Sequence, residues 1–288
     1  MFDTRRFIFS KLVFIVFVFL SFSTEAIEDS SPAQDGAKIM FLQKTQLAIF
    51  RFYINLPRLV YELEESGQVF SEPVLQGFED LVRYEAQVNE YFGQSFDGPF
   101  QAQVDGFKLE WQEIRDLYSV LLDLTEQDGY INTGVQFQIF TAVFQLYSKM
   151  RAPIRDLIKQ SPSLQEDFDL RMREQGIRLV MLNIFYMIDT PQWDPADLKF
   201  GVNLNTSYAN LFINFEQELE KLNSEFPSES LNSATLFWKM IRATLKERGT
   251  EWNYRGPYPL LVNRYLDSMS TRFTALVDNS EPTFKLAN

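Results

Sequence analysis

The sequence predicts an all-α protein, made of two tandem four-helix-bundle units with about eight helices after a cleaved signal peptide. Three observations support this fold class. Apolar residues recur at spacings of three and four along most of the chain. Clusters of Pro, Gly and Asp separate these periodic segments. Alternating strand-like runs bounded by hairpin turns are not found.

The first 26 residues have the form of a secretory signal peptide. A short basic region precedes an apolar run from Leu12 to Phe22, and small and polar residues follow it. This run is shorter than the about 20 residues that a membrane-spanning helix needs, so we expect cleavage, a periplasmic location and no stable membrane anchor afterwards. Residues 27–36 are polar and contain Pro and Gly, and we expect them to form a flexible leader.

The helices expected from the periodicity fill the rest of the chain. Pro57 is expected to bend or break the first of them. Ser163 and Glu166 have the spacing of a capping box at the start of the fifth. Gly249 follows the seventh as a natural C-terminal cap. The expected ranges are 38–65, 72–92, 105–126, 133–160, 164–189, 197–224, 229–248 and 257–279.

Two segments of the chain are similar to each other. The segment from Trp111 to Arg115 reads W-Q-E-I-R, and 127 residues later the segment from Trp238 to Arg242 reads W-K-M-I-R. Met and Gln three residues apart also open both halves, at positions 40–43 and 172–175. We therefore expect a duplicated unit, with residues 37–161 as the first copy and 162–288 as the second. A single irregular helical domain is the alternative.

Each half resembles the PilJ-type domain, the sensory N-terminal module of type IV pilus methyl-accepting chemotaxis transducers, which is related to nitrate- and nitrite-sensing helical bundles. That family opens with G-R-x-R-M-L-S-Q-R, and Gly36–Lys44 reads G-A-K-I-M-F-L-Q-K here. The second half keeps Arg171, Met172 and Gln175, with Gly176 in place of the closing Arg. The family's transducers continue into a second membrane span and a cytoplasmic signalling coiled coil. The resemblance implies that this chain acts through a separate membrane-bound chemoreceptor or sensor kinase.

The polar motif that opens each half is the best candidate ligand site. In the related sensors, guanidinium groups on the first helix receive a small anion, and paired donors of this kind suit a planar oxyanion. The alternative is a set of solvated charges on a helix surface. The candidate ligand-binding residues are Gln43, Lys44, Arg171, Gln175 and Arg178.

Two tryptophan–arginine pairs are a second candidate. Trp111 with Arg115, and Trp238 with Arg242, stand four residues apart and could line a pocket between helices. A buried tryptophan with an arginine reaching to solvent is the alternative. The acidic residues at 216, 218 and 220 point to different sides of a helix, so we expect them to form a solvated surface.

Composition excludes several classes of function. The 288 residues contain no His and no Cys, which removes Ser-His-Asp triads, thiol nucleophiles and the usual zinc ligands. The net charge of −12 argues against nucleic acid as a partner. We expect no catalytic residues, metal or cofactor, and a non-catalytic sensory or accessory binding module that recognises a small ligand or partner between helices. The alternatives are a structural or assembly accessory of the cell envelope, serving pilus or secretion machinery, and an enzyme based on carboxylates alone.

Overall fold

The computed structural model describes residues 31–66, 72–128, 132–188, 204–248 and 259–278; the expected signal peptide lies outside these ranges. Within them the chain forms eight α-helices, one short 3₁₀ helix (η1) and no strand, which confirms the predicted all-α fold. None of the described helices is both long and apolar enough to cross a membrane. The elements are α2 (Pro32–Ser66), α3 (Glu72–Phe92), α4 (Gly98–Asp128), α5 (Thr133–Gln160), η1 (Pro162–Glu166), α6 (Phe168–Ile188), α7 (Leu204–Glu225), α8 (Glu229–Arg248) and α9 (Pro259–Asp278).

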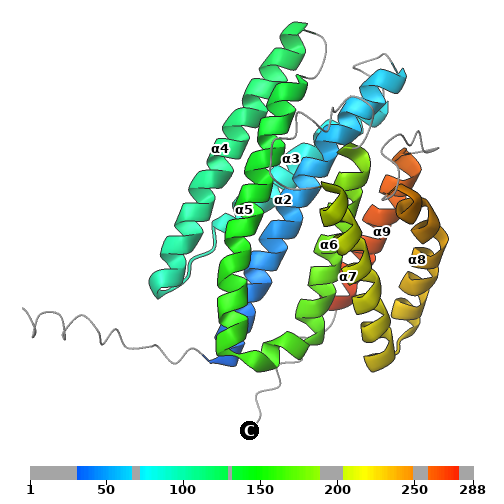
Figure 1. Ribbon diagram of the computed structural model, residues 1–288. Helices are drawn as coiled ribbons and strands as arrows, with labels where there is room; N and C mark the ends of the chain where they lie inside the picture. Colours follow the sequence, from blue (N-terminus) through cyan, green and yellow to red (C-terminus); the bar gives the residue numbers. More distant parts are fainter. Residues whose placement is uncertain (1–30, 67–71, 129–131, 189–203, 249–258, 279–288) are drawn as a thin grey trace, which may run out of the picture.

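The eight helices form two four-helix units that lie side by side (Figure 1). In the first unit α2 packs against α3 and α5, and α4 completes the ring. In the second unit α6 packs against α7 and α9, and α8 completes the ring. The first helices of the two units, α2 and α6, pack against each other in the middle of the molecule. The expected pair of four-helix units is therefore present.

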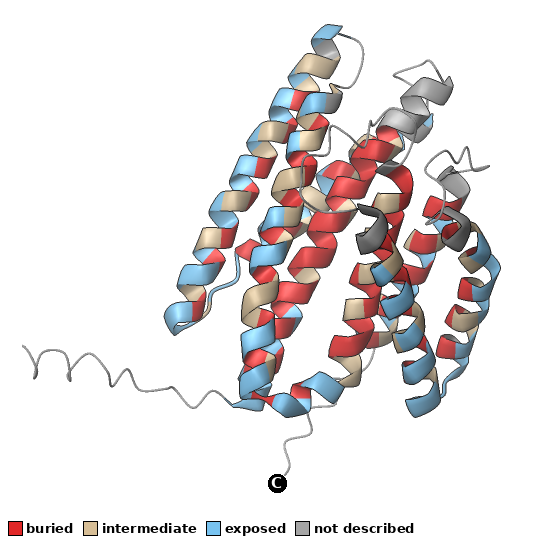
Figure 2. Cartoon of the chain, viewed as in Figure 1, coloured by how far each residue is buried: buried red, intermediate tan, exposed pale blue. Residues whose placement is uncertain are grey.

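The two units share apolar packing through α6. Ile177 and Ile184 of α6 belong to the apolar core of the first unit. Leu179 and Leu182, on another side of the same helix, belong to the core of the second. Figure 2 accordingly shows α2 and α6 buried over much of their circumference, whereas α4 and α8 are buried on one side only. The expected boundary between residues 161 and 162 coincides with the end of α5, but the packing continues across it.

Aromatic rings fill both cores in place of the disulfides that the chain cannot form. Phe52 meets the edge of Trp111 at a centroid distance of 5.1 Å in the first unit. Phe215 and Trp238 lie 4.6 Å apart in the second. Tilted pairs of this kind contribute about 0.5–1.5 kcal/mol each beyond the area that they bury.

The expected starts at 197 and 257 lie outside the described residues, and α2, α4 and α6 start elsewhere than expected. Local hydrogen bonds explain the starts of α2 and α6. Within the expected flexible leader, residues 32–36 form the first turn of α2, because Ser31 and Gln34 cap each other through 3.3 and 3.4 Å hydrogen bonds. The helix α4 begins seven residues early, at Gly98, whose φ of 64° suits glycine. The expected capping box at Ser163 is wrong, because Ser163 lies in η1 and Asp167 accepts the capping hydrogen bond of α6 from Leu170 N–H at 2.9 Å.

We expected a bend or a break at Pro57, and α2 runs through this residue as one helix, so a break does not occur. The buried residues on both sides of Pro57 include Leu56 and Leu59, each almost fully enclosed. Tertiary packing of this kind outweighs the loss of one backbone hydrogen bond at a proline.

Candidate functional site

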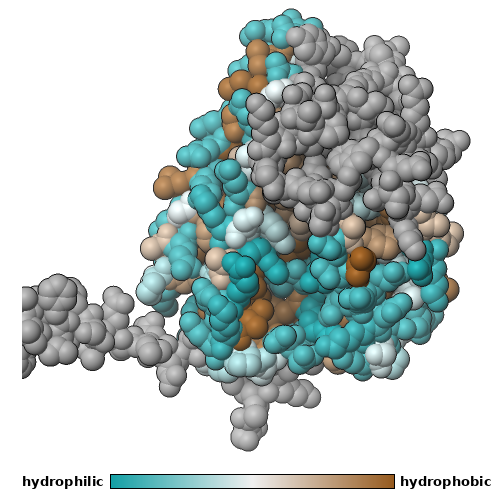
Figure 3. Space-filling model, in the orientation of Figure 1, coloured by the Kyte–Doolittle hydropathy of each residue, from teal (hydrophilic) through white to brown (hydrophobic). Residues whose placement is uncertain are grey.

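A pocket of about 250 Å³ lies where the two units meet. Its walls come from α2 and α5 of the first unit, from η1, and from α6 and α7 of the second. Between the lower parts of α5 and α6, the space-filling view shows apolar atoms in a hollow that hydrophilic side chains surround (Figure 3). The pocket therefore combines an apolar interior with a charged rim.

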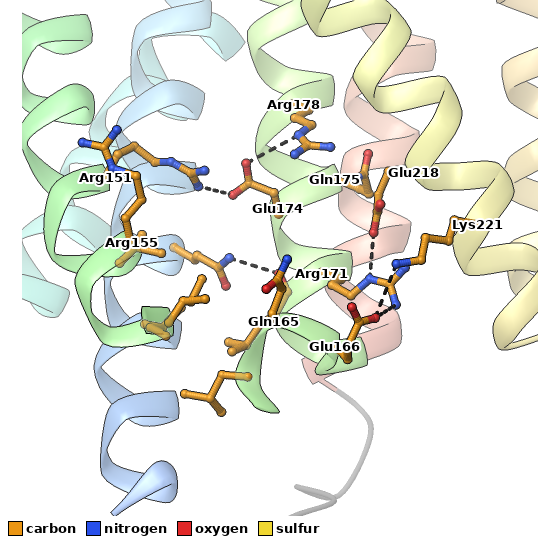
Figure 4. A pocket seen from close by; sticks show the side chains of 16 residues that line it. Arg151, Arg155, Gln165, Glu166, Arg171, Glu174, Gln175, Arg178, Glu218 and Lys221 are labelled. Carbon is orange, nitrogen blue, oxygen red and sulfur yellow. Dashed lines mark hydrogen bonds and ion pairs between the residues drawn. The ribbon is translucent and has the colours of Figure 1, made fainter. Parts of the chain in front are cut away.

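Helical spacing explains why so many functional groups point into one space. On α5, Arg151, Ile154, Arg155 and Ile158 line the pocket at intervals of three and four residues, so they share one face. On α6, positions 171, 174, 175 and 178 do the same. Figure 4 shows the charged side chains of α5 and α7 approaching α6 from its two sides.

Guanidinium groups outnumber carboxylates on the α5 side of the pocket. Glu174 pairs with Arg151 by a short contact and with Arg178 at 3.5 Å. Burial disfavours the charged form of Arg151, but Glu174 and Tyr147 together raise the pKa of this guanidinium above its usual value. Arg155 also lines the pocket, and no hydrogen bond or ion pair joins it to another described residue. This side of the pocket thus has three guanidinium groups and one carboxylate, which pairs with two of them.

The α7 side has the opposite balance. Arg171, which is buried, donates to Glu218 at 2.7 Å, to Glu225 at 2.5 Å and to Glu166 at 3.4 Å. Burial works against its charge, but the hydrogen bonds to Glu225 and Glu218 raise its pKa. The hydrogen bond from Arg171 also lowers the pKa of the Glu225 carboxyl. Lys221 joins this group at 3.4 Å from Glu166. Arg171 is therefore already neutralised, so the surplus of positive charge lies on the α5 side.

Two buried amides in the pocket wall have polar atoms without a hydrogen-bond partner among the described residues. Gln175 is 0% exposed, and neither its Oε1 nor its Nε2 has a hydrogen-bond partner. Gln43, 4% exposed, donates from Nε2 to the Leu170 carbonyl at 3.0 Å, while its Oε1 has no partner. Buried polar atoms are nearly always hydrogen-bonded, to protein, water or ligand. Both amides therefore retain unused hydrogen-bonding groups.

The structure brings together four of the five candidate ligand-binding residues. Gln43, Arg171, Gln175 and Arg178 all line this pocket, although Gln43 is distant in sequence from the other three. Lys44 is not among the lining residues; its ammonium lies 3.4 Å from the Asp278 carboxylate. Successive residues of a helix point in different directions, which explains why Gln43 and Lys44 have different surroundings.

The tryptophan–arginine pairs lie elsewhere and repeat one arrangement. Trp111, on α4, donates from its indole nitrogen to Asn89 at 2.9 Å, and Trp238, on α8, donates to Glu216 at 3.3 Å. In both cases the acceptor stands 22 residues earlier, on the preceding helix. Both indoles are buried. The matching bonds make the two units equivalent at this point.

The arginines of these pairs bind acidic residues of the neighbouring helix. Arg115 donates to Glu85 at 2.6 Å, and Arg242 lies 3.1 Å from Glu216. None of the four residues of the two pairs lines the pocket. They hold α3 to α4 and α7 to α8.

One further expectation about charged residues is wrong. The acidic run on α7 does not form a merely solvated surface, because Glu216 binds Trp238 and Arg242, and Glu218 binds Arg171 in the pocket wall. The residues that the sequence reasoning missed are Arg151 and Arg155. Their spacing of four residues on one helix face was the available signal, but it is common on exposed helices.

No protein-family model, no curated protein and no solved structure matches this chain. The site therefore has to be interpreted from its own geometry.

Proposed function

We propose that this protein is an exported, non-catalytic sensory or accessory module that binds a small anion in the pocket between α5 and α6. The observation that carries the proposal is the charge surplus beside Glu174, where three guanidinium groups face one carboxylate and the buried amide of Gln175 has no partner. Arginine is well suited to this role, since it stays charged and presents paired donors to an oxyanion.

The charge pairing favours binding over catalysis. The carboxylates of the pocket wall, Glu166, Glu174 and Glu218, each pair with an arginine or a lysine. A carboxylate held in this way is a poor general acid or base, because its partner stabilises the ionised form. An enzyme based on carboxylate pairs is therefore the weaker interpretation.

The position of the pocket offers a way to transmit binding. An anion between Arg155 of α5 and Arg178 of α6 would join the two four-helix units at the place where α2 packs against α6. A change in this packing could be read by a separate membrane-bound chemoreceptor or sensor kinase, as the resemblance to PilJ-type domains suggests. The signal-peptide pattern of the first 26 residues supports a periplasmic location for this event.

Thermal unfolding of the purified chain tests the proposal. Nitrate, nitrite, phosphate, sulfate and simple carboxylates are added one at a time, with sodium chloride at equal ionic strength as the reference. An anion at about a hundred times its Kd stabilises the folded state by about 2.7 kcal/mol. For a protein of this size, that raises Tm by roughly 5–10 °C.

Matched variants locate the effect. Arg155→Gln should remove most of the Tm shift, because it deletes the guanidinium that has no partner among the described residues. Lys159→Gln is the control: Lys159 is one turn further along the same helix, is exposed, and binds Asp156 instead of lining the pocket. The proposal fails if no anion shifts Tm, or if both variants respond alike. A pull-down from membrane fractions with and without the active anion then tests for the signalling partner.

A structural or assembly accessory of the cell envelope is the second candidate, and one observation favours it. Leu236 and Met240 stand one turn apart on α8, and they are 63% and 70% exposed. Exposed apolar neighbours are typical of protein interfaces. If Leu236→Asp abolishes capture of an envelope partner while anion binding is unchanged, this second role is supported.

A further inference from the structure

We infer that the ligand of this pocket is an organic carboxylate with an apolar body, and not an inorganic oxyanion. This inference rests on the proposed function and specifies the class of anion. It depends on the combination of apolar and cationic groups in the pocket wall.

The cationic part of the wall can hold one carboxylate group. Arg155 is free of protein partners among the described residues, and Arg151 and Arg178 share a single carboxylate. This side therefore carries a surplus of two positive charges, and one added carboxylate reduces that surplus to one. Gln175 adds an unpartnered amide N–H donor in the same wall. A carboxylate group presents two acceptor oxygens to these guanidinium and amide donors.

Another part of the pocket wall is aliphatic. Five branched side chains from α2, α5, η1 and α6 line it, and four of the five are buried. An inorganic oxyanion gains nothing from such groups, since contact with them costs it hydration without a compensating hydrogen bond. An alkyl or aromatic body gains free energy from the same contact. The five residues are Ile39, Ile154, Ile158, Leu164 and Leu170.

The size of the pocket agrees with a small organic molecule. Its volume of about 250 Å³ lies just below the range of roughly 300–1,000 Å³ that is usual for pockets that hold drug-sized ligands. A carboxylate with a body of a few carbon atoms would occupy this space, and a four- or five-atom inorganic ion would leave most of it unfilled.

Isothermal titration of the purified full-length chain with a graded series of ligands tests this inference. Acetate, butyrate and hexanoate share the carboxylate and differ in the body; hexanamide keeps the body and lacks the charge. We expect affinity to rise about three- to fourfold for each added methylene, until the body fills the pocket. Hexanamide should bind at least tenfold more weakly than hexanoate. Nitrate and phosphate should bind no better than acetate.

Three variants separate the two parts of the pocket. Arg155→Gln should weaken every carboxylate by about tenfold or more, and Lys159→Gln should not. Ile158→Ala should reduce the gain from butyrate to hexanoate, with little effect on acetate. Arg155 and Lys159 are exposed, so these two substitutions leave the packed core intact.

Each result has a definite consequence. Nitrate or phosphate bound more tightly than hexanoate, in a manner that depends on Arg155, overturns this inference and leaves the proposed function standing. Equal binding of hexanoate and hexanamide, or hexanoate binding that Arg155→Gln does not weaken, also overturns it. Failure of every anion to bind overturns the proposed function as well.

Discussion

Ser161, the residue that ends α5, donates a 2.8 Å hydrogen bond to the carboxylate of Asp35 in the first turn of α2. Asp35 is fully buried, and its other carboxylate oxygen has only Lys38 nearby, at 3.9 Å. A buried carboxylate depends strongly on each hydrogen bond that it keeps. This contact joins the first and last helices of the first unit, next to the pocket.

Removal of the Ser161 hydroxyl should therefore destabilise the first unit. We expect Ser161→Ala to lower the free energy of unfolding by about 1.5–3 kcal/mol, since the hydrogen bond has a charged acceptor. Urea unfolding followed by circular dichroism measures the change. Ser148→Ala is the control, because Ser148 is exposed and its hydroxyl bonds only to the Phe144 carbonyl of its own helix. Equal effects of the two substitutions would show that the bond to Asp35 contributes nothing specific.

Two glycines in different surroundings give a matched pair of stability predictions. A Cβ atom at Gly77 of α3 would lie 2.6 Å from Leu59 Cδ2 on α2, whereas one at Gly106 of α4 would meet nothing within 4 Å. Gly106→Ala should stabilise the protein by about 0.5–1 kcal/mol, because alanine favours the helix. Gly77→Ala should cost about 1–3 kcal/mol, because Leu59 is buried and has little room to move.

The same urea experiment checks both glycines. A second substitution that shortens the neighbour, Leu59→Val, should recover part of the stability lost in Gly77→Ala if the close approach of α2 and α3 is the cause. If Gly77→Ala is as stable as Gly106→Ala, the two helices do not need a glycine at their contact.

The sequence was sufficient to predict the helices, but not to predict where each of them begins. Apolar spacing around Trp111 and Trp238 predicted two amphipathic helices, and each buries its tryptophan. The early start of α2 was missed because Pro32 was interpreted as a disorder signal, although Ser31 and Gln34 make it the first turn of a capped helix. A capping pair gives a weak signal in sequence, since the same residue types are common in loops.

Only part of the candidate site could be predicted, and the reason is again that the sequence signal is local. Gln175 and Arg178 stood out because they belong to a motif that opens the second half, and both line the pocket. Arg151 and Arg155 belong to the end of α5, and their placement opposite α6 depends on how the two units pack. Contacts between distant helices follow from the tertiary fold, which spacing along one helix does not reveal.

Glu174 should limit how strongly the pocket attracts an anion. Glu174→Gln removes the one carboxylate that Arg151 and Arg178 share, so the positive charge left for a ligand increases. We expect anion affinity to rise roughly tenfold, as measured by titration calorimetry at constant ionic strength. The variant should also lose about 1 kcal/mol of stability, because the ion pairs are only partly exposed.

Glu110→Gln is the matched control for this prediction. Glu110 of α4 pairs with Lys149 at 2.8 Å, and neither residue lines the pocket. The control should leave anion affinity unchanged. A rise of similar size in both variants would mean that net charge alone governs binding, and that Glu174 has no local role.

Tyr147 of α5 makes the stability of the fold sensitive to high pH. Burial, followed by the nearby charge of Glu174, raises the pKa of its phenol from about 10 to about 12. The folded state thus prefers the neutral phenol, and this preference contributes fully below pH 10. The contribution is lost as pH rises from 10 to 12, where the unfolded chain ionises first, and it amounts to about 2–3 kcal/mol.

Tyr147→Phe isolates this effect, since phenylalanine keeps the ring contact with Phe50 at 4.9 Å and has no group to ionise. Burial raises the pKa of Tyr53 and of Tyr118 as well. The wild type and the Tyr147→Phe variant should therefore both lose stability at high pH. The quantity to measure is the difference between them, by urea unfolding at intervals from pH 9 to pH 12. The wild type should lose about 2–3 kcal/mol more than the variant over this range. Parallel curves would show that the phenol of Tyr147 ionises in the folded protein as readily as in the unfolded chain.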